Sequence, residues 1–407
     1  MLRNTVISKL RSARSDYLRA LKPSNKSFWK AVSSLNRGNS RIPTLVSEDG
    51  EEASAPASKA TLLNNQFVKN FNSSIPPLSK EDLPRLPLHS DDSLFCSEDK
   101  IFDMLSHLDI LKAAGPDGIS ARMLKETATS ISAMITTIFN MSISTGVLTD
   151  QWKKSLVVPI PKSGGSSNPA NYRPISLIPI VSKLLERHIC DLLLDHFEVS
   201  PQQLGFQEGK SATNAILSAV NDWYIQLENG FEVLAVFFDL QKAFDSVPHS
   251  LLLQKLHSLG IPCHLIRWIA NYLHDCSQQI AVDGELSPHT SVVSRVPQGS
   301  ILGPILFLIY IDGLCCIHLS SGNTVLFADD LLLHSRISQP SDFIVLQKNV
   351  DELCNWLNNY SLTLNAKKCM SLLISRKKQP IEVPAINVKG HPLERVTAYK
   401  YLGILIT

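Results

Sequence analysis

The pattern of apolar and polar positions predicts a β-hairpin that carries two adjacent carboxylates. Apolar side chains dominate residues 324–327 and 331–333, and the pair Asp329-Asp330 lies between these two short runs. Short apolar runs that flank a polar pair are typical of a hairpin with the pair at its turn. A turn lets adjacent acids reach a shared site without being buried unpaired. For this segment alone, an ordinary aspartate-containing turn is the alternative.

A second apolar run predicts where another acid lies. Residues 233–238 are rich in aliphatic and aromatic side chains and end on Asp239, which indicates a buried strand. A carboxylate from a distant strand, together with Asp329 and Asp330, could hold two divalent cations about 3.5–4 Å apart and so clamp a phosphoryl displacement. Oxygen ligands of this kind suit Mg²⁺. Asp239 alone would more often be a satisfied turn acid, but the three acids together favour a metal site.

The rest of the pattern alternates between helical and extended segments. It predicts helices at residues 98–111, 121–144 and 176–195, strands at 156–160 and 361–364, and an apolar helix after Pro297-Gln298-Gly299. Pro159 favours a sheet edge for its strand, because proline has no backbone N–H to donate. The mixture of helices, strands and a hairpin predicts an α+β fold.

The first hundred residues differ from the remainder. They predict an amphipathic helix at residues 2–21, a second short helix from Phe28, an acidic connector at 47–58 and an extended proline-rich segment at 75–87. Although the net charge of the chain is only +2, residues 1–41 carry ten Lys or Arg against one acid, Asp16. This basic arm is suited to contact a nucleic-acid backbone, and it fits a solvated helix face equally well.

Composition narrows the class of protein. A chain of 407 residues with 44% hydrophobic and 19% charged residues is typical of globular proteins. No apolar stretch reaches the roughly 18 residues that cross a bilayer, and no signal pattern opens the chain. We therefore expect an intracellular protein without membrane contact, with nucleus and cytoplasm both open. The eight cysteines lack Cys-x-x-Cys spacing, which favours reduced thiols over a zinc site.

Several sequence motifs follow one another in a characteristic order. They are GPDG at 115–118, NYRPIS at 171–176, DLQKAFDSV at 239–247, VPQGSILGP at 296–304, FADD at 327–330, LNAKK at 364–368 and YKYLG at 399–403. Together they resemble the reverse transcriptases of non-LTR (LINE-like, jockey-type) retrotransposons. The resemblance extends over roughly residues 100 to 407, most of the chain.

The resemblance implies a fold and an activity. It implies right-hand polymerase fingers and palm with an antiparallel catalytic sheet, preceded by a helical N-terminal extension. We expect a basic helical extension and linker at residues 1–60, an N-terminal fingers extension at 61–140 and the fingers-palm domain at 141–407. The implied reaction is RNA-directed DNA synthesis, which adds dNTPs to a DNA primer on an RNA template with Mg²⁺ or Mn²⁺. The oligomeric state stays open.

The resemblance also implies roles for five residues around the substrate. Lys162 and Arg173 would grip the triphosphate, with ordinary surface cations as the alternative. Phe244 would act as a steric gate against a ribose 2′-hydroxyl, unless it is simply a core ring. Gln298 would bond the templating strand, and Gly299 would let the backbone approach template or nucleotide because it lacks a Cβ atom. A helix N-terminal turn is the structural alternative for this pair.

The C-terminal motifs imply further roles. Lys368 would protonate the pyrophosphate leaving group, although its neighbour Lys367 leaves the register open and a surface lysine is the alternative. Residues 401–403 resemble the start of a primer-grip hairpin, and residues 205–211 match a template-side segment for which no chemistry can be derived. Because the chain ends at Thr407 and no endonuclease motif precedes residue 100, we expect a fragment lacking endonuclease and thumb. A catalytically silent nucleic-acid scaffold is the alternative function.

Overall fold

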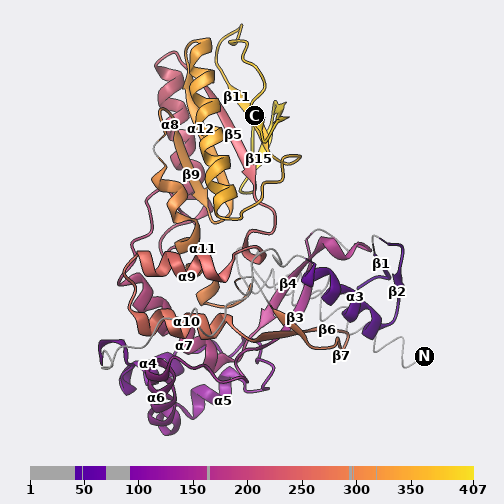
Figure 1. Ribbon diagram of the computed structural model, residues 1–407, viewed down its shortest axis with the longest axis vertical. Coiled ribbons are helices and arrows are strands. Elements are labelled where there is room, and N and C mark those ends of the chain that lie inside the picture. The colour runs from indigo at the N-terminus through magenta and orange to yellow at the C-terminus, as the bar shows by residue number, and fades with distance from the viewer. Residues whose placement is uncertain are drawn as a thin grey trace, which may run out of the picture.

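The fold is described from a computed structural model (Figure 1). The structure describes residues 42–47, 49–69, 92–162, 166–292, 296, 298–317 and 319–407. The expected N-terminal helices, the basic arm and the extended segment at 75–87 therefore lie outside the described residues. In the described part, no helix is both long enough and apolar enough to span a membrane.

A five-stranded sheet forms the upper part of the molecule in Figure 1. Its strands lie in the order β14 (Glu394–Val396), β11 (Met370–Ile374), β5 (Glu232–Asp239), β10 (Asp330–Ile337) and β9 (Asn323–Phe327). β5 pairs antiparallel with both β10 and β11, and only the β11–β14 pair is parallel. The continuous apolar run of β5 is explained by this central position, because both faces of the strand are buried.

Alternate residues of β5 enter two different cores. Leu234, Val236 and Phe238 face the large core, which includes α12 (Pro340–Asn359) and α11 (Leu302–Ile311). The residues between them face a smaller core formed with α8 (Ala212–Glu228) and Tyr401. The sheet is therefore covered on both faces, and the end of β5 that carries Asp239 lies at the lower edge of the sheet (Figure 1).

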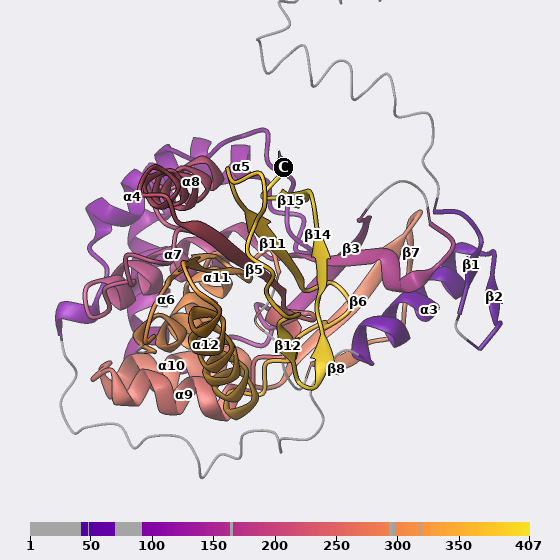
Figure 2. The ribbon, with the colours of Figure 1, turned by 90° about the horizontal axis from the view of Figure 1, so that it is seen from above.

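A second sheet lies to one side of the helical body (Figure 2). Its strands are β4 (Tyr172–Leu177), β3 (Lys154–Pro161), β6 (Cys276–Val282) and β7 (Glu285–Leu286), with β8 (Thr290–Val292) also paired to β6. The prediction that Pro159 marks an edge strand is wrong, since β3 lies between β4 and β6. Proline is tolerated because the pairing with β6 stops at Val157, so no β6 carbonyl requires its missing N–H.

The N-terminal end of the described chain covers this second sheet. The segment expected as a connector, residues 47–58, contains β2 (Glu52–Ala53), which forms a hairpin with β1 (Leu45–Val46). It also contains the first residues of α3 (Pro56–Val68). Pro56 suits the first turn of a helix because its missing N–H would have no helical partner there. α3 packs on β6 and runs through the domain boundary expected at residue 60.

Helices form the lower part of the molecule (Figure 1). They are α4 (Glu98–Ser106), α5 (Ala121–Glu126), α6 (Ala128–Thr145), α7 (Ile180–Leu194), α9 (His249–Ser258) and α10 (Cys263–Leu273). The helix expected at 98–111 ends early, at Ser106, and in the turn that follows the Asp109 side chain accepts from the Leu111 N–H. The helix expected at 121–144 is divided at Thr127, and that expected at 176–195 starts only after Pro179, because Ser176 and Leu177 belong to β4.

Short elements complete the C-terminal region. Two hairpins form there, β12 (Asn387–Val388) with β13 (His391–Pro392), and β15 (Tyr399–Tyr401) with β16 (Ile404–Ile406). The strand expected at 361–364 is wrong, since only Leu364 makes an isolated bridge, to Leu240. The expected mixture of helices and sheets is confirmed, but the sheet that carries Asp239 is not wholly antiparallel, because β11 pairs parallel with β14. Short 3₁₀ turns lie at Asp92–Leu94, Pro169–Asn171, Ala243–Asp245 and Asp312–Cys316.

Candidate active site

The predicted hairpin is present with the two aspartates where its strands meet. β9 ends at Phe327 and β10 begins at Asp330, so Ala328 and Asp329 form a two-residue turn. Ala328 has φ +58°, a backbone conformation that side chains other than glycine rarely adopt. Asp239 lies directly opposite Asp330 in the β5–β10 register. The sheet thus brings Asp239 next to a pair of acids that lies about ninety residues later in the sequence.

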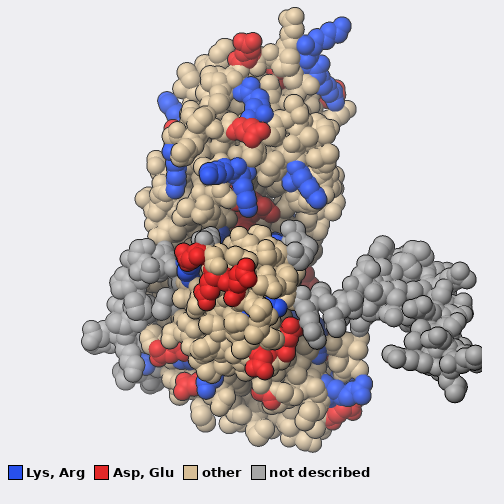
Figure 3. All heavy atoms as spheres, turned by 90° about the vertical axis from the view of Figure 1, so that its right-hand side faces the viewer, with Lys and Arg blue, Asp and Glu red and all other residues tan. Residues whose placement is uncertain are grey.

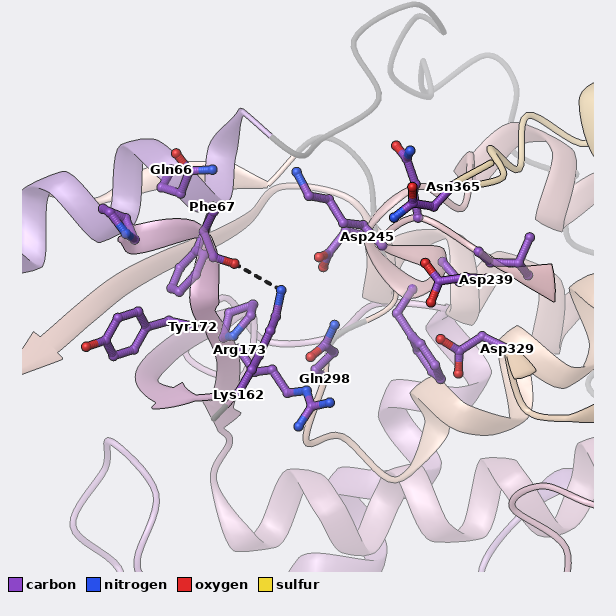
Figure 4. A pocket seen from close by; sticks show the side chains of 18 of the residues that line it. Gln66, Phe67, Lys162, Tyr172, Arg173, Asp239, Asp245, Gln298, Asp329 and Asn365 are labelled. Atoms are coloured by element: carbon purple, nitrogen blue, oxygen red, sulfur yellow. Dashed lines mark hydrogen bonds between the residues drawn. The ribbon is translucent and has the colours of Figure 1, made fainter. Parts of the chain in front are cut away.

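A cavity of about 380 Å³ opens beside these acids, between the upper sheet and the second sheet. Seven of the nine site residues predicted from the sequence line it: Lys162, Arg173, Asp239, Phe244, Gln298, Asp329 and Lys368. Asp330 and Gly299 are not among its lining residues. Figure 4 shows Asp239 and Asp329 close together on one side, with Lys162 and Arg173 across the cavity.

The hairpin carboxyl groups are electrostatically strained. The pKa of Asp329 is raised by burial and by Asp239, against opposing effects of its own backbone N–H and of Arg173. The pKa of Asp330 is raised from 3.8 to about 6, first by loss of solvent around the carboxyl group and then by Asp329 and Asp239. This second shift arises although the Asp330 residue as a whole is exposed. A bound cation would relieve both effects, because it favours the charged carboxylates.

The acids are better suited to bind a cation such as Mg²⁺ as a pair of carboxylates than as a site made wholly of protein ligands. Among the residues that the structure describes, no group of three or more His, Cys, Asp and Glu side chains is arranged to hold a metal. Two carboxylates, Asp239 and Asp329, line the cavity. Mg²⁺ is commonly bound through one or two carboxylates together with substrate phosphates, which matches this arrangement.

Basic side chains surround the opposite part of the cavity. Lys162 follows β3, and its Nζ donates to the carbonyl of Ala170 at 3.0 Å (Figure 4). Its pKa is lowered by burial and then by three neighbouring cations, in the order Lys368, Arg173 and Lys242, while Asp245 opposes the shift. Such repulsion between cations indicates a site that would be stabilised by an anion.

The turn after β5 supplies the aromatic part of the lining. Phe244 lies in the 3₁₀ turn that follows Lys242, whose φ is +47°. Its ring stacks on Phe307 of α11, with centroids 4.3 Å apart, and meets Phe206 edge-on at 5.9 Å. Phe244 is partly buried against the large core and also lines the cavity. Its position is therefore compatible with a steric gate and with a core ring.

The turn before α11 is fixed to the second sheet. The Gln298 carbonyl accepts from the Ser176 N–H of β4 at 2.7 Å, while Gln298 also lines the cavity. Gly299 has φ +106°, and a Cβ atom there would lie 2.6 Å from the Ser176 carbonyl oxygen. The group that lies close to Gly299 is therefore the backbone of β4. The apolar helix expected next is present as α11.

A buried acid holds the start of α11. The Glu186 carboxylate, fully buried on α7, accepts from the N–H groups of Ile301 at 2.7 Å and Leu302 at 3.2 Å. Burial raises the pKa of Glu186 to about 7, although these two backbone donors favour its charged form. The start of the helix that follows Gln298 is thus anchored by a polar group in the core.

The 365–368 turn brings a lysine to the acids. The Asn365 N–H donates to the Asp239 carbonyl at 2.8 Å, and the Lys368 N–H donates to the Asn365 carbonyl at 2.9 Å. Of the two neighbouring lysines, Lys368 lines the cavity and Lys367 does not. The hairpin expected after Tyr401 is present as β15–β16, and Tyr399 stacks on Phe237 at 4.1 Å.

Sequence reasoning missed several residues that line the cavity: Gln66, Phe67, Lys242, Asp245 and Asn365. Lys242 and Asp245 had a signal, since both lie within the DLQKAFDSV motif. Gln66 and Phe67 had none. They belong to α3, which reaches the cavity only because it packs on the second sheet.

Comparison with known proteins gives the family. Residues 160–406, more than half of the chain, match the family model described as reverse transcriptase (RNA-dependent DNA polymerase). The chain is 27% identical over 323 residues to the RNA-directed DNA polymerase from mobile element jockey of Drosophila melanogaster, which covers 76% of this chain and 35% of that protein. It is 27% identical over 408 residues to the probable RNA-directed DNA polymerase from transposon BS of the same species, covering 93% of this chain.

The chain thus spans 35% and 44% of the lengths of these two relatives. Among solved structures, a telomerase from Candida tropicalis, determined with a fragment of telomeric RNA, aligns over 60% of this chain and 45% of its own, with a TM-score of 0.41 and 13% identity. The family match covers Asp239, Asp329 and Asp330, and most of the cavity lining. On this match, the chain belongs to the reverse transcriptase (RNA-dependent DNA polymerase) family.

Proposed function

We propose that this chain is an RNA-directed DNA polymerase that adds deoxynucleotides to the 3′-hydroxyl of a DNA primer paired with an RNA template. The observation that supports this most directly is the cavity itself, where two carboxylates lie across from a group of cations. A nucleoside triphosphate with divalent cations complements both sides of such a cavity. The names of the two relatives describe the same activity.

Asp239 and Asp329 are the residues we assign to the divalent cations, with Mg²⁺ as the expected ion and Mn²⁺ as a substitute. Asp330 follows Asp329 on the same hairpin, but it does not line the cavity, so we do not assign it as a direct ligand. When bound, the cations would favour attack by the primer hydroxyl and offset charge on the leaving pyrophosphate. The raised pKa of Asp329, to which Asp239 contributes, supports this assignment.

The cations of the cavity would hold and orient the triphosphate. Arg173 is suited to form bidentate hydrogen bonds with phosphate oxygens, whereas Lys162 would act as a mobile point charge. Lys242 adds a third cation that the sequence reasoning did not assign. Lys368 would donate a proton to the departing pyrophosphate, a kind of assistance that contributes about 10²–10⁴-fold in rate.

The remaining lining would select the sugar and contact the template. Phe244 would exclude a 2′-hydroxyl, and its stacking on Phe307 would keep the ring from yielding. Gln298 would contact the templating strand, because its backbone is fixed to β4 while its side chain stays at the cavity. On this proposal the upper sheet is the palm, the second sheet belongs to the fingers, and β15–β16 begins the primer grip.

A basic C-terminal region would contact nucleic acid. Residues 365–407 contain eight Lys or Arg and only two acids, Glu382 and Glu394. Figure 3 shows basic side chains spread over the upper part of one face, with acidic side chains in the hollow below them. Cations on a surface beside the cavity are suited to bind phosphates of a primer–template duplex.

Primer extension tests this proposal. The purified chain would be given a DNA primer on matched RNA and DNA templates, with each dNTP and with Mg²⁺ or Mn²⁺. We expect templated extension on RNA that requires the divalent cation and disappears in Asp239→Asn. Tight binding of primer–template without extension under any of these conditions would refute the proposal and favour the silent nucleic-acid scaffold.

A further inference from the structure

A glutamine outside the cavity holds the turn that presents Asp329. Gln203 precedes the segment at residues 205–211 whose chemistry the sequence did not reveal. It is fully buried, with no exposed surface, and it does not line the cavity. Its side-chain amide contacts the Ala328 peptide, which lies immediately before Asp329. Any effect of Gln203 on catalysis would therefore be transmitted through this turn.

The contacts of Gln203 use both ends of its amide. Oε1 accepts from the Ala328 N–H at 2.8 Å and from the Gly205 N–H at 2.9 Å. Nε2 donates to the Ala328 carbonyl at 3.3 Å. One side chain thus satisfies both backbone polar groups of Ala328. A carboxamide offers an acceptor oxygen and an N–H donor side by side, which suits the two backbone groups of Ala328.

The residue held by Gln203 is the one that needs support. Ala328 has φ +58°, a conformation that costs about 1 kcal/mol or more for a residue with a Cβ atom and persists only when its surroundings enforce it. Without Gln203, the buried Ala328 N–H would lose its partner and the turn could relax. A relaxed turn would change the direction of Asp329 relative to Asp239.

The backbone around Gln203 lies against the same hairpin. The Leu204 N–H donates to the Leu326 carbonyl at 2.7 Å, and the Leu326 N–H donates to the Gln202 carbonyl at 2.9 Å. A Cβ atom on Gly205 would lie 2.3 Å from the Ala328 nitrogen, so only glycine allows this close approach. These backbone contacts hold residues 202–205 against the hairpin, and the Gln203 amide holds the Ala328 turn.

We infer that Gln203 is a positioning residue, which sets the Ala328 turn and thereby aims the Asp329 carboxylate into the cavity. This inference rests on the proposed polymerase function for its kinetic consequences, but the turn itself can be examined without any activity. An ordinary buried glutamine would contribute to stability alone. A positioning glutamine must also change the turnover rate and must be replaceable by a group with the same donor and acceptor pattern.

The first test separates turnover from binding. In primer extension, Gln203→Ala should lower kcat by about 10–100-fold, since small misplacements of reacting groups have effects of this size. The KM for dNTP should change by less than about threefold, because the cations of the cavity are untouched. Gln202→Ala is the matched control, since Gln202 is adjacent and exposed and its backbone bond to Leu326 does not depend on the side chain.

The second test uses a carboxyl group as a reversible substitute. When protonated, the carboxyl introduced by Gln203→Glu offers one acceptor and one O–H donor, as the amide does. When ionised, it loses the donor and places negative charge against the Ala328 carbonyl. Activity relative to wild type at the same pH should therefore rise about tenfold or more from pH 8 to pH 6. Gln202→Glu, which adds the same charge outside the turn, should show a flat ratio.

The third measurement does not depend on polymerase activity. Hydrogen exchange of the Ala328 amide should be about tenfold faster or more in Gln203→Ala than in wild type, with Gln202→Ala unchanged. If wild type extends no primer but this difference is found, the proposed function fails and the assignment of the turn stands. If Gln203→Ala keeps wild-type kcat and Ala328 exchange, or Gln203→Glu is no more active at pH 6 than Gln203→Ala, the positioning role is wrong.

Discussion

Replacing Asp330 by asparagine should stabilise the protein in the absence of divalent cations. The substitution keeps the shape of the side chain and removes one charge from a group of three acids. The folded-state pKa of Asp330 is about 6 against an ordinary value of 3.8, so the charged form is disfavoured in the folded protein. The causes are loss of solvent and repulsion by Asp329 and Asp239. Asparagine experiences neither effect.

The size of the effect follows from this difference. One pKa unit corresponds to about 1.4 kcal/mol, so a difference of about two units sets a ceiling near 3 kcal/mol. Asp330 is exposed, and water and salt screen its interactions, so about 1 kcal/mol is the better expectation. For a chain of this size that corresponds to a rise in Tm of about 1–2 °C.

The pH dependence gives the prediction its sign. Below about pH 4, Asp330 is protonated in folded and unfolded chains, so the substitution should change nothing. Between about pH 4 and 6 the unfolded chain ionises first, and wild type progressively loses stability relative to Asp330→Asn. The difference should be complete above the folded-state pKa of about 6 and constant at higher pH.

Thermal unfolding in EDTA at pH 4, 5, 6, 7 and 8 measures this difference. Asp150→Asn is the matched control, because Asp150 is an exposed aspartate in the turn before β3, outside the cavity lining. It should leave Tm unchanged across the series. A lower Tm for Asp330→Asn at pH 7, or a difference that does not vary with pH, would refute the idea that the acids repel one another in the empty site.

Three further substitutions test other parts of the site. Lys162→Met should raise the KM for dNTP about tenfold with a smaller change in kcat, as steady-state extension would show; an unchanged KM would make Lys162 a surface cation. Phe244→Ala should raise ribonucleotide incorporation relative to deoxynucleotides in competition assays, and an unchanged ratio would make the ring purely core. Glu186→Ala should lower the free energy of unfolding in urea by about 2–4 kcal/mol, because two N–H groups at the start of α11 lose their acceptor. Glu186→Gln keeps an acceptor, so equal losses in the two variants would contradict this explanation.

The parts of the site that the sequence predicted are those with a local signal. The hairpin at Asp329 and the strand that ends at Asp239 both follow from short apolar runs that stop at acids. Proximity of distant motifs came from family resemblance, because periodicity does not reveal which strands pair. Only the structure shows which of Lys367 and Lys368 lies at the cavity, because the hydrogen bond from the Asn365 N–H to the Asp239 carbonyl holds this turn.

Other features depend on tertiary contacts that no local pattern encodes. Phe67 reaches the cavity because α3 packs on the second sheet, far from its neighbours in sequence. Pro159 appeared to mark an edge strand, yet β3 is interior, because pairing with β6 ends before the proline. In the sequence, nothing distinguishes Gln203 from other polar loop residues. Only the structure shows that its side-chain amide contacts the Ala328 backbone. Asp330 matches Asp329 in the sequence, but the turn geometry sends only Asp329 to the cavity.

Single-nucleotide incorporation under Mg²⁺ titration tests the central claim most directly. The claim is that Asp239 and Asp329 hold the divalent cations for addition of a deoxynucleotide to a primer on RNA. Wild type and Asp150→Asn should extend the primer with the same rate and the same dependence on Mg²⁺. Asp329→Asn, shown to be folded by its thermal unfolding in EDTA, should be slower by at least about 10²-fold at every Mg²⁺ concentration, because a metal ligand is lost. Extension by folded Asp329→Asn at the wild-type rate and Mg²⁺ dependence would contradict the account.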